Sequence, residues 1–277
     1  MTHSSGFLSF VYHHPLWYPL LLLFRTRWFS CVMGWIFQTP LSKFLIGPLS
    51  RIYQISLDTY QIPVNGFLSL NQFFIREKKS ELISFPEKHL GSPVDGCVEL
   101  FRDITVTNDF VVKWYHANLL NLFWPDISEF IWGDVCFCRL RFSDYHRFHF
   151  FDNGEILSSI SRDGPLYSVD NRVLDTGLWI HNKSHLMRIR TANFGEILWL
   201  EVGATNVWSI TNHKKVGETF SRWEEKWYFE LGGSAVLLVF QKDVIQWSED
   251  LIQKTLQREE YEVVTGQEIG GRINGKQ

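Results

Sequence analysis

The fold is decided by an apolar run near the C-terminus, where residues 231–241 read LGGSAVLLVFQ. The run Ala235–Gln241 is short, unbroken and apolar, which predicts a buried strand. Two other segments have the same character, Val135–Phe142 (VCFCRLRF) and Ile197–Ile210 (ILWLEVGATNVWSI). Gly203-Ala204 interrupts the latter and predicts a bulge or a close backbone contact. These segments indicate a β-rich core.

Turn signals separate short apolar segments from Ser92 onward, and Asp152-Asn-Gly154 predicts a tight hairpin turn. A helical period follows only at Gln246–Glu260, before a final strand at Glu262–Ile269. The dinucleotide-binding GxGxxG and the phosphate-binding GxxxxGK[ST] motifs are both missing. We therefore expect a mainly β (α+β) fold, with one antiparallel β-rich catalytic domain over residues 58–277.

The first part of this domain, residues 58–90, reads as a connector and contains two local features. Phe67–Phe74 predicts a short helix. The four residues that follow Ile75, Arg76-Glu-Lys-Lys79, are all charged. Such a run is typical of a solvated surface, so we expect these side chains to face water.

Residues 1–57 contain no acidic residue but carry Arg25, Arg27, Lys43 and Arg51. Two apolar runs of about ten residues each, rich in Trp and Phe, flank the first two arginines, and each is shorter than the roughly 20 residues that a transmembrane helix needs. Cations, tryptophans and short apolar runs predict a helical segment lying in the interface of an anionic membrane. A buried helical hairpin and a signal or transmembrane segment are the alternatives.

Composition excludes some classes of function. The 277 residues include 27 Lys or Arg and 30 Asp or Glu, so the net charge is −3 and a general nucleic-acid binder is disfavoured. The four cysteines, Cys31, Cys97, Cys136 and Cys138, have no zinc-like spacing. We expect them to be free, buried and reduced, with Cys136 and Cys138 on the same side of a strand.

Three local motifs carry side chains that could do chemistry. Ser92-Pro-Val-Asp95-Gly96 contains a carboxylate at a turn, although Asp is also an ordinary turn former. Asp144-Tyr-His146-Arg-Phe-His149 contains two histidines, for which satisfied structural residues, metal ligands and acid–base groups are all open readings. Gly232-Gly-Ser234 precedes the apolar strand and is most often only a turn. Together, Asp95, His149 and Ser234 permit a charge-relay arrangement.

The chain resembles the phosphatidylserine decarboxylase proenzymes over roughly residues 65–270. The resemblance rests on the joint occurrence, in order, of several blocks: Phe73-Phe-Ile-Arg-Glu77, Ser92-Pro-Val-Asp-Gly96, Asp144-Tyr-His-Arg-Phe-His149, Val202-Gly-Ala-Thr205, Gly232-Gly-Ser234 and Thr265-Gly-Gln-Glu-Ile-Gly270. One departure is Ala235, because the family's processing site usually has a threonine after the serine.

The resemblance implies autocatalytic cleavage between Gly233 and Ser234, with His149 as the base and Asp95 orienting it. It implies a β chain of residues 1–233 and an α chain of residues 234–277, which stay associated as a heterodimer, and relatives suggest a dimer of these. Ser234 becomes a covalent pyruvoyl (pyruvate) cofactor, which forms a Schiff base with phosphatidylserine and releases CO₂ to give phosphatidylethanolamine. His146 acts in decarboxylation, and no metal is needed.

The same resemblance makes the protein a carboxy-lyase of phospholipid biosynthesis, made as a zymogen and held peripherally on the cytoplasmic side of the cell membrane. Arg147 and Lys183 are candidates for holding the lipid phosphate. Two other readings stay open on the residues alone. One is a membrane-associated serine hydrolase that uses Asp95, His149 and Ser234. The other is a lipid-binding relative that does not cleave itself.

Overall fold

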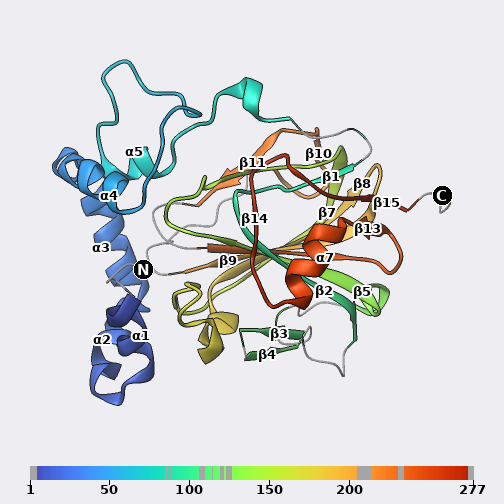
Figure 1. The fold of residues 1–277 in the computed structure, drawn as a ribbon, viewed down its shortest axis with the longest axis horizontal. Coiled ribbons are helices and arrows are strands. Elements are labelled where there is room, and N and C mark those ends of the chain that lie inside the picture. The colour runs from blue at the N-terminus through green and yellow to red at the C-terminus, as the bar shows by residue number, and fades with distance from the viewer. Residues whose placement is uncertain are drawn as a thin grey trace.

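The computed structural model describes residues 5–84, 87, 89–105, 110–113, 115–118, 122, 127–204, 214–229 and 234–273. Its largest element is an antiparallel sheet of eight strands in the order β10-β7-β8-β9-β12-β5-β2-β14 (Figure 1). The mainly β fold is therefore confirmed. The strands of this central sheet are β2 (Gly96–Ile104), β5 (Gly133–Leu140), β7 (Gly154–Arg162), β8 (Ser184–Thr191), β9 (Gly195–Gly203), β10 (Thr219–Phe220), β12 (Ser234–Phe240) and β14 (Tyr261–Val263).

Strand β12 is the interior strand that the sequence predicts, and all seven of its residues are buried. It pairs along its whole length with β5 on one side and β9 on the other. Successive side chains enter two different apolar clusters, with Val236, Leu238 and Phe240 in one and Leu237 and Val239 in the other. An unbroken apolar run is the pattern expected of a strand that is covered on both faces.

Smaller elements cover the two faces of the central sheet. The Val236 face packs against β6 (Arg147–His149), which pairs with β11 (Glu225–Tyr228), and against β13 (Ile245–Trp247) and α7 (Glu249–Leu256). Strand β13 belongs to a three-stranded sheet with β1 (His89–Gly91) and β15 (Glu268–Arg272). The Leu237 face packs against the short 3-10 helices Ser128–Phe130 and Leu178–His181 and the hairpin of β3 (Phe110–Val112) and β4 (Tyr115–Ala117).

Several local predictions are wrong. The segment Asp152–Gly154 does not form a hairpin turn, because β6 pairs with β11 whereas β7 pairs with β8 and β10. The register of β9 is regular up to Gly203, so of the two alternatives predicted for Gly203-Ala204, a bulge or a close backbone contact, the bulge is not formed. The predicted last strand is two strands, β14 and β15, which pair with β2 and β1 respectively. In each case strand partners that are distant in sequence decide the outcome.

The four cysteines are free, and three of them are buried. Cys136 and Cys138 face the same side of β5, as predicted, with their Sγ atoms 3.7 Å apart. Cys31 is exposed, which corrects the expectation that all four are buried. Its helix presents this side chain to the surface rather than to the domain core.

The N-terminal segment is helical, as predicted, and lies at one side of the β body (Figure 1). In the part of the chain that the structure describes, no single helix has the length and apolarity to cross a membrane. Pro15–Phe24 and Arg27–Gln38 would together pass that test, but a bend of 63° separates them. The helices are α1 (Ser5–His13), α2 (Tyr18–Phe24), α3 (Arg27–Gln38), α4 (Ile46–Ile52) and α5 (Leu70–Phe74).

These helices contact the β body through a few buried residues and leave many aromatic ones exposed. Val11 and Leu21 pack against Tyr167, and the hydroxyl of Tyr167 accepts a hydrogen bond of 2.6 Å from Arg25. By contrast, Trp28 and Trp35, seven residues apart on one face of α3, are 68% and 70% exposed. The segment is thus attached to the domain while presenting an apolar outer face.

Truncating β12 should destabilise the whole domain. Leu238→Ala removes a fully buried side chain, so we expect a loss of about 2–5 kcal/mol and a fall in the thermal midpoint of roughly 5–15 °C. The matched control is Leu256→Ala at the exposed end of α7, which should change stability by no more than about 0.5 kcal/mol. Scanning calorimetry measures both, and equal shifts would contradict the central position of β12.

Candidate active site

Ser234 is the first residue of β12 and lies between Leu140 of β5 and Gly203 of β9. It shares a face with Val236, two residues along the strand. The side chain is completely buried, and its Oγ has no hydrogen-bond partner among the described residues. A buried hydroxyl without a partner costs about 1–3 kcal/mol, so such an atom needs an explanation, and a reactive role is one. The preceding residue, Gly233, lies outside the described residues.

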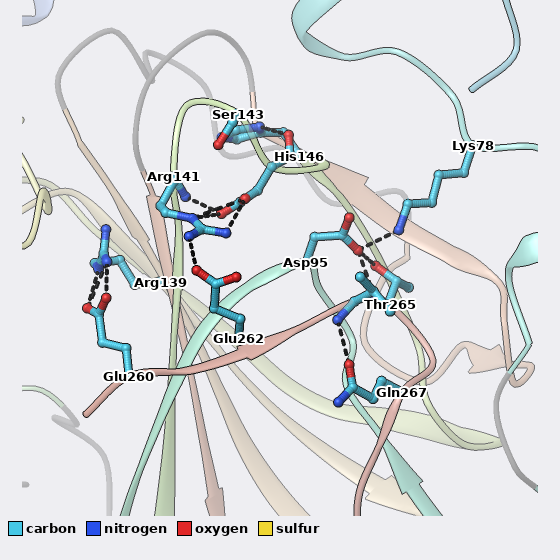
Figure 2. Close-up of polar contacts among 12 residues, drawn as sticks. Lys78, Asp95, Arg139, Arg141, Ser143, His146, Glu260, Glu262, Thr265 and Gln267 are labelled. Atoms are coloured by element: carbon cyan, nitrogen blue, oxygen red, sulfur yellow. Dashed lines mark hydrogen bonds and ion pairs between the residues drawn. The ribbon is translucent and has the colours of Figure 1, made fainter. Parts of the chain in front are cut away.

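Asp95 lies at the turn before β2, near the same end of the central sheet, because the next residue, Gly96, begins β2. Its Oδ1 accepts three hydrogen bonds, from Lys78 Nζ at 2.6 Å and from the amide and the hydroxyl of Thr265 at 2.7 Å each (Figure 2). Both members of the Lys78–Asp95 ion pair are buried. The turn therefore holds a carboxylate whose position is fixed from two directions.

His149, at the end of β6, is buried and has both ring nitrogens hydrogen-bonded. Its Nδ1 lies 3.0 Å from the carbonyl oxygen of Trp223, and because a carbonyl can only accept, we assign the ring proton to Nδ1. Its Nε2 is then the basic nitrogen, and it accepts from the Tyr145 hydroxyl at 3.2 Å. Burial lowers the pKa of His149, and the nearby Lys78 and Arg147 lower it further against the opposing effects of the Trp223 carbonyl and Glu225. The site thus holds a neutral imidazole.

The direct contact expected between Asp95 and His149 is not formed. The hydrogen bonds to the carboxylate come from Lys78 and Thr265, and the histidine Nδ1 faces a backbone carbonyl instead. The two residues are linked through Tyr145, because the Lys78 ammonium lies 4.9 Å from the centre of the ring whose hydroxyl contacts His149. Likewise, no hydrogen bond joins Ser234 Oγ to either histidine among the described residues.

His146 is completely buried three residues before His149. Its Nδ1 donates to the carbonyl oxygen of Asp144 at 3.0 Å, and its ring lies against Phe74 of α5, with 3.8 Å between centroids. The backbone of this loop is held by Arg76, which donates to the carbonyl oxygens of Ser143 at 2.6 Å and Asp144 at 3.2 Å. The side chain and the loop that carries it are therefore both fixed.

Arg76 and Lys78 were expected to be solvated, and this prediction is wrong. Both are buried, whereas Glu77 and Lys79 between and after them are exposed. The segment is extended, with Lys78 bridged to Tyr60, so alternate side chains point inward. The sequence shows four successive charges and gives no sign of this alternation. The two buried cations are stable because Arg76 donates to the carbonyl oxygens of residues 143 and 144 and Lys78 pairs with Asp95.

A cavity of about 480 Å³ lies beside Asp95. The ion pair Lys78–Asp95 is in its wall, and the opposite wall comes from the segment that follows α4, including Tyr53 and Ile55. Arg147, a candidate for holding lipid phosphate, instead pairs with Glu77 at 3.0 Å and Glu225 at 2.9 Å. The charge on Arg147 is thus already balanced. For Lys183, burial and the neighbouring Arg27 lower its pKa.

Comparison with known proteins gives consistent matches over most of the chain. A family model described as phosphatidylserine decarboxylase matches residues 70–271, from α5 to β15. The phosphatidylserine decarboxylase proenzyme of Ruminiclostridium cellulolyticum is 32% identical over 261 residues, covering 92% of this chain and 87% of its own. The corresponding proenzymes of Clostridium kluyveri and Chlamydia caviae are each 33% identical, over 96% and 90% of this chain and 93% and 85% of theirs.

The imidazole of His149 should stay neutral at pH values where an exposed histidine is protonated. Because burial lowers its pKa below the ordinary value of 6.5, the unfolded chain binds the proton first as pH falls. The contribution of His149 to stability is therefore complete above pH 6.5 and decreases below it. Nuclear magnetic resonance of ¹⁵N-labelled histidine in an uncleaved Ser234→Ala chain measures the midpoint, with His149→Gln identifying the signal. A midpoint at or above 6.5 would contradict this assignment.

Proposed function

Because the chain belongs to the phosphatidylserine decarboxylase family, we propose that it is a self-processing carboxy-lyase that converts phosphatidylserine into phosphatidylethanolamine and CO₂. The observation that carries the proposal is the buried hydroxyl of Ser234 at the head of the central strand, which has no hydrogen-bond partner among the described residues. A nucleophile in this place can act on the peptide bond that immediately precedes it.

In the first step, Ser234 Oγ attacks the carbonyl carbon of Gly233 and gives its proton to His149. The new C–O bond forms as the C–N bond breaks, so the chain continues through an ester and the nitrogen of Ser234 becomes an amine. A serine hydroxyl needs such a base to become a useful nucleophile. Support comes from the neutral state of His149 and from its proton on Nδ1, which leaves Nε2 basic once the Tyr145 hydroxyl withdraws.

In the second step, the Cα proton of Ser234 leaves and the bond between Cβ and the ester oxygen breaks. Residue 233 then ends in a carboxylate, and residue 234 becomes a dehydroalanine. Water replaces the nitrogen of residue 234, which departs as ammonia and leaves a pyruvoyl group at the new N-terminus. When formed, this group supplies a carbonyl that binds the substrate amine and an electron sink for the decarboxylation.

The residues present fit this group. It would occupy the position of the Ser234 side chain, where the hydroxyl finds no partner and the surroundings are dry. Exclusion of water favours decarboxylation, because the departing carboxylate is less stabilised than in water. His146 would place or donate the proton at the carbon that loses CO₂. Its fixed ring, held by Phe74 and the Asp144 carbonyl, supports that role.

The two products of cleavage, residues 1–233 and 234–277, would stay together without a covalent link. Strand β12 pairs on both sides with strands of the longer piece, and β14 and β15 also pair with β2 and β1 of that piece. Removing the shorter piece would expose an entire apolar strand on both of its faces. The hydrophobic cost of that exposure favours a permanent heterodimer.

The substrate is a lipid, so we also propose peripheral attachment to the cytoplasmic side of the cell membrane through the N-terminal helices. Support comes from the exposed Trp28 and Trp35 of α3 and from Leu41 and Phe44 in the following 3-10 helix, which are 77% and 81% exposed. This segment carries only cationic charges, which suit an anionic surface. The cavity beside Asp95 is walled by the segment that follows α4 and would receive the headgroup.

Ser234→Ala should leave one intact chain without decarboxylase activity, because both steps need the hydroxyl. The wild-type chain should give two bands on a denaturing gel, and intact mass spectrometry should find a fragment of residues 234–277 that begins with pyruvoyl. The matched control is Ser184→Ala, since Ser184 is also buried with an unpartnered Oγ but lies on β8. It should cleave and form phosphatidylethanolamine normally. An active wild type that stays in one piece would instead indicate a serine hydrolase or another mechanism.

Removing the exposed tryptophans of α3 should weaken membrane binding. Each Trp can bury a large apolar area at the interface, so Trp28→Gln/Trp35→Gln should lower the partition coefficient onto vesicles containing phosphatidylserine by at least about tenfold. The control is Trp132→Gln/Trp223→Gln, which changes two exposed tryptophans of the β body. Flotation through a density gradient measures both, and an equal effect of the two double variants would count against the helices as the attachment site.

A further inference from the structure

A buried ion pair lies on the same face of the central sheet as Ser234 and has no part in the steps above. It joins Lys226 of β11 to Glu201 of β9, whose side chains are 1% and 0% exposed. The ammonium lies 5.4 and 5.3 Å from the ring centroids of Phe148 and Trp199. Burying two charges costs more than their attraction commonly returns, so stability alone is a weak reason for such a pair.

The strand register brings Glu201 close to Ser234. Ser234 lies opposite Gly203 of β9, and Val236 lies opposite Glu201. Because alternate residues of a strand share a face, Ser234 and Glu201 project to the same side as diagonal neighbours. Such neighbours are about 7–8 Å apart, within reach of a long side chain. Gly203, opposite Ser234, has no side chain to lie between them.

Each of these two neighbours has a buried polar atom that lacks a partner among the described residues. Glu201 accepts the lysine through Oε1, while its Oε2 makes no hydrogen bond there. The Oγ of Ser234 also makes no hydrogen bond to any described residue. One atom is an acceptor and the other carries a donor proton. A hydrogen bond between them would satisfy both atoms, and a hydrogen bond to a carboxylate is among the stronger kinds.

We propose that Glu201 is a positioning residue for self-cleavage, which holds the Ser234 hydroxyl through Oε2 while Lys226 holds the other carboxylate oxygen, Oε1. The inference rests on the proposed function. The hydrogen bond selects the side-chain rotamer from which Oγ faces the Gly233 carbonyl. The proton stays on the serine oxygen until attack and then passes to His149, so Glu201 ends each cleavage unchanged.

Other titratable groups lie near this ion pair, and their influence on the pH dependence of cleavage must be distinguished from that of the pair. His185 of β8 lies opposite Glu201, and its two ring nitrogens contact the hydroxyls of Ser159 and Ser161 at 3.0 and 2.8 Å. Burial lowers the pKa of His185, while Glu201 raises it and Lys226 lowers it. On β11, Glu225 precedes Lys226 and pairs with Arg147, and His149 lies opposite Glu225 on β6. His185→Gln is therefore one of the control variants.

The test follows cleavage of the full-length chain after cell-free synthesis, as the fraction of cleaved protein against time from pH 6 to pH 9. The double variant Glu201→Leu/Lys226→Met replaces the pair with apolar residues and should fold with little loss of stability. We expect it to cleave about 10- to 100-fold more slowly than wild type. Lys226→Met alone leaves a buried carboxylate without its cation, and burial disfavours an unpaired charge. The acidic limb of its pH–rate profile should therefore move to higher pH.

The matched control is Arg139→Met/Glu260→Leu. This pair is also largely buried, but Arg139 lies opposite Ala235 and so faces the other side of the sheet from Ser234. Both this variant and His185→Gln should cleave at the wild-type rate with an unshifted profile. Two results would overturn this inference but leave the proposed function standing. One is a folded Glu201→Leu/Lys226→Met chain that cleaves at the wild-type rate, and the other is a Lys226→Met chain whose pH–rate profile is unshifted. A wild-type chain that never cleaves overturns the proposed function as well.

Discussion

The rest of the structure depends on the pairing of β12 with β5 and β9. Every residue of this strand is buried, and every one has a partner on both sides. A strand so held cannot leave or shift register without opening the core of the domain. Its first residue, Ser234, therefore keeps its place whether or not the chain before it is intact. The proposed cofactor, made from the polypeptide itself, would require this property, since no separate binding pocket would retain it.

The end of the sheet that carries Ser234 has several buried charges, and each is held by specific partners. Lys78 neutralises Asp95, Lys226 neutralises Glu201, and Arg76 donates to two backbone carbonyls. Exposed pairs such as Arg190–Glu155 contribute little to stability, because water and salt screen their attraction. Buried charges cost far more to place, but in a dry environment they act strongly on nearby protons. Their concentration around this end of the sheet fits the chemistry proposed there.

The sequence was sufficient for features that depend on local pattern. The apolar run of β12, the common face of Cys136 and Cys138, and the helical N-terminal segment all follow from periodicity and composition. Prediction from the sequence failed where the local structure depends on residues that are distant in the chain. Asp152–Gly154 has the residues of a hairpin turn, yet the strands it joins belong to different sheets. Arg76 and Lys78 look solvated because the carbonyls and the carboxylate that hold them come from residues 95 and 143–144.

The same distinction applies to the candidate site. Asp95, His149, His146 and Ser234 could be chosen from motifs, but their mutual contacts could not. The structure places Lys78 and Tyr145 between Asp95 and His149, so the carboxylate has no direct contact with the imidazole in this arrangement.

The N-terminal helices and the candidate site share one apolar cluster, and this explains how they can be coupled. Phe73 and Phe74 of α5 pack against Phe37 of α3 and Ile46 of α4, while the ring of Phe74 also lies against His146. Helices that rest on a bilayer would thus be one side chain away from the imidazole proposed to protonate the product. A lipid whose chains remain in the membrane needs such a short path, because only its headgroup can reach the site. With membrane attachment as proposed, the covering of α5 by α3 and α4 would serve the substrate as well as the fold.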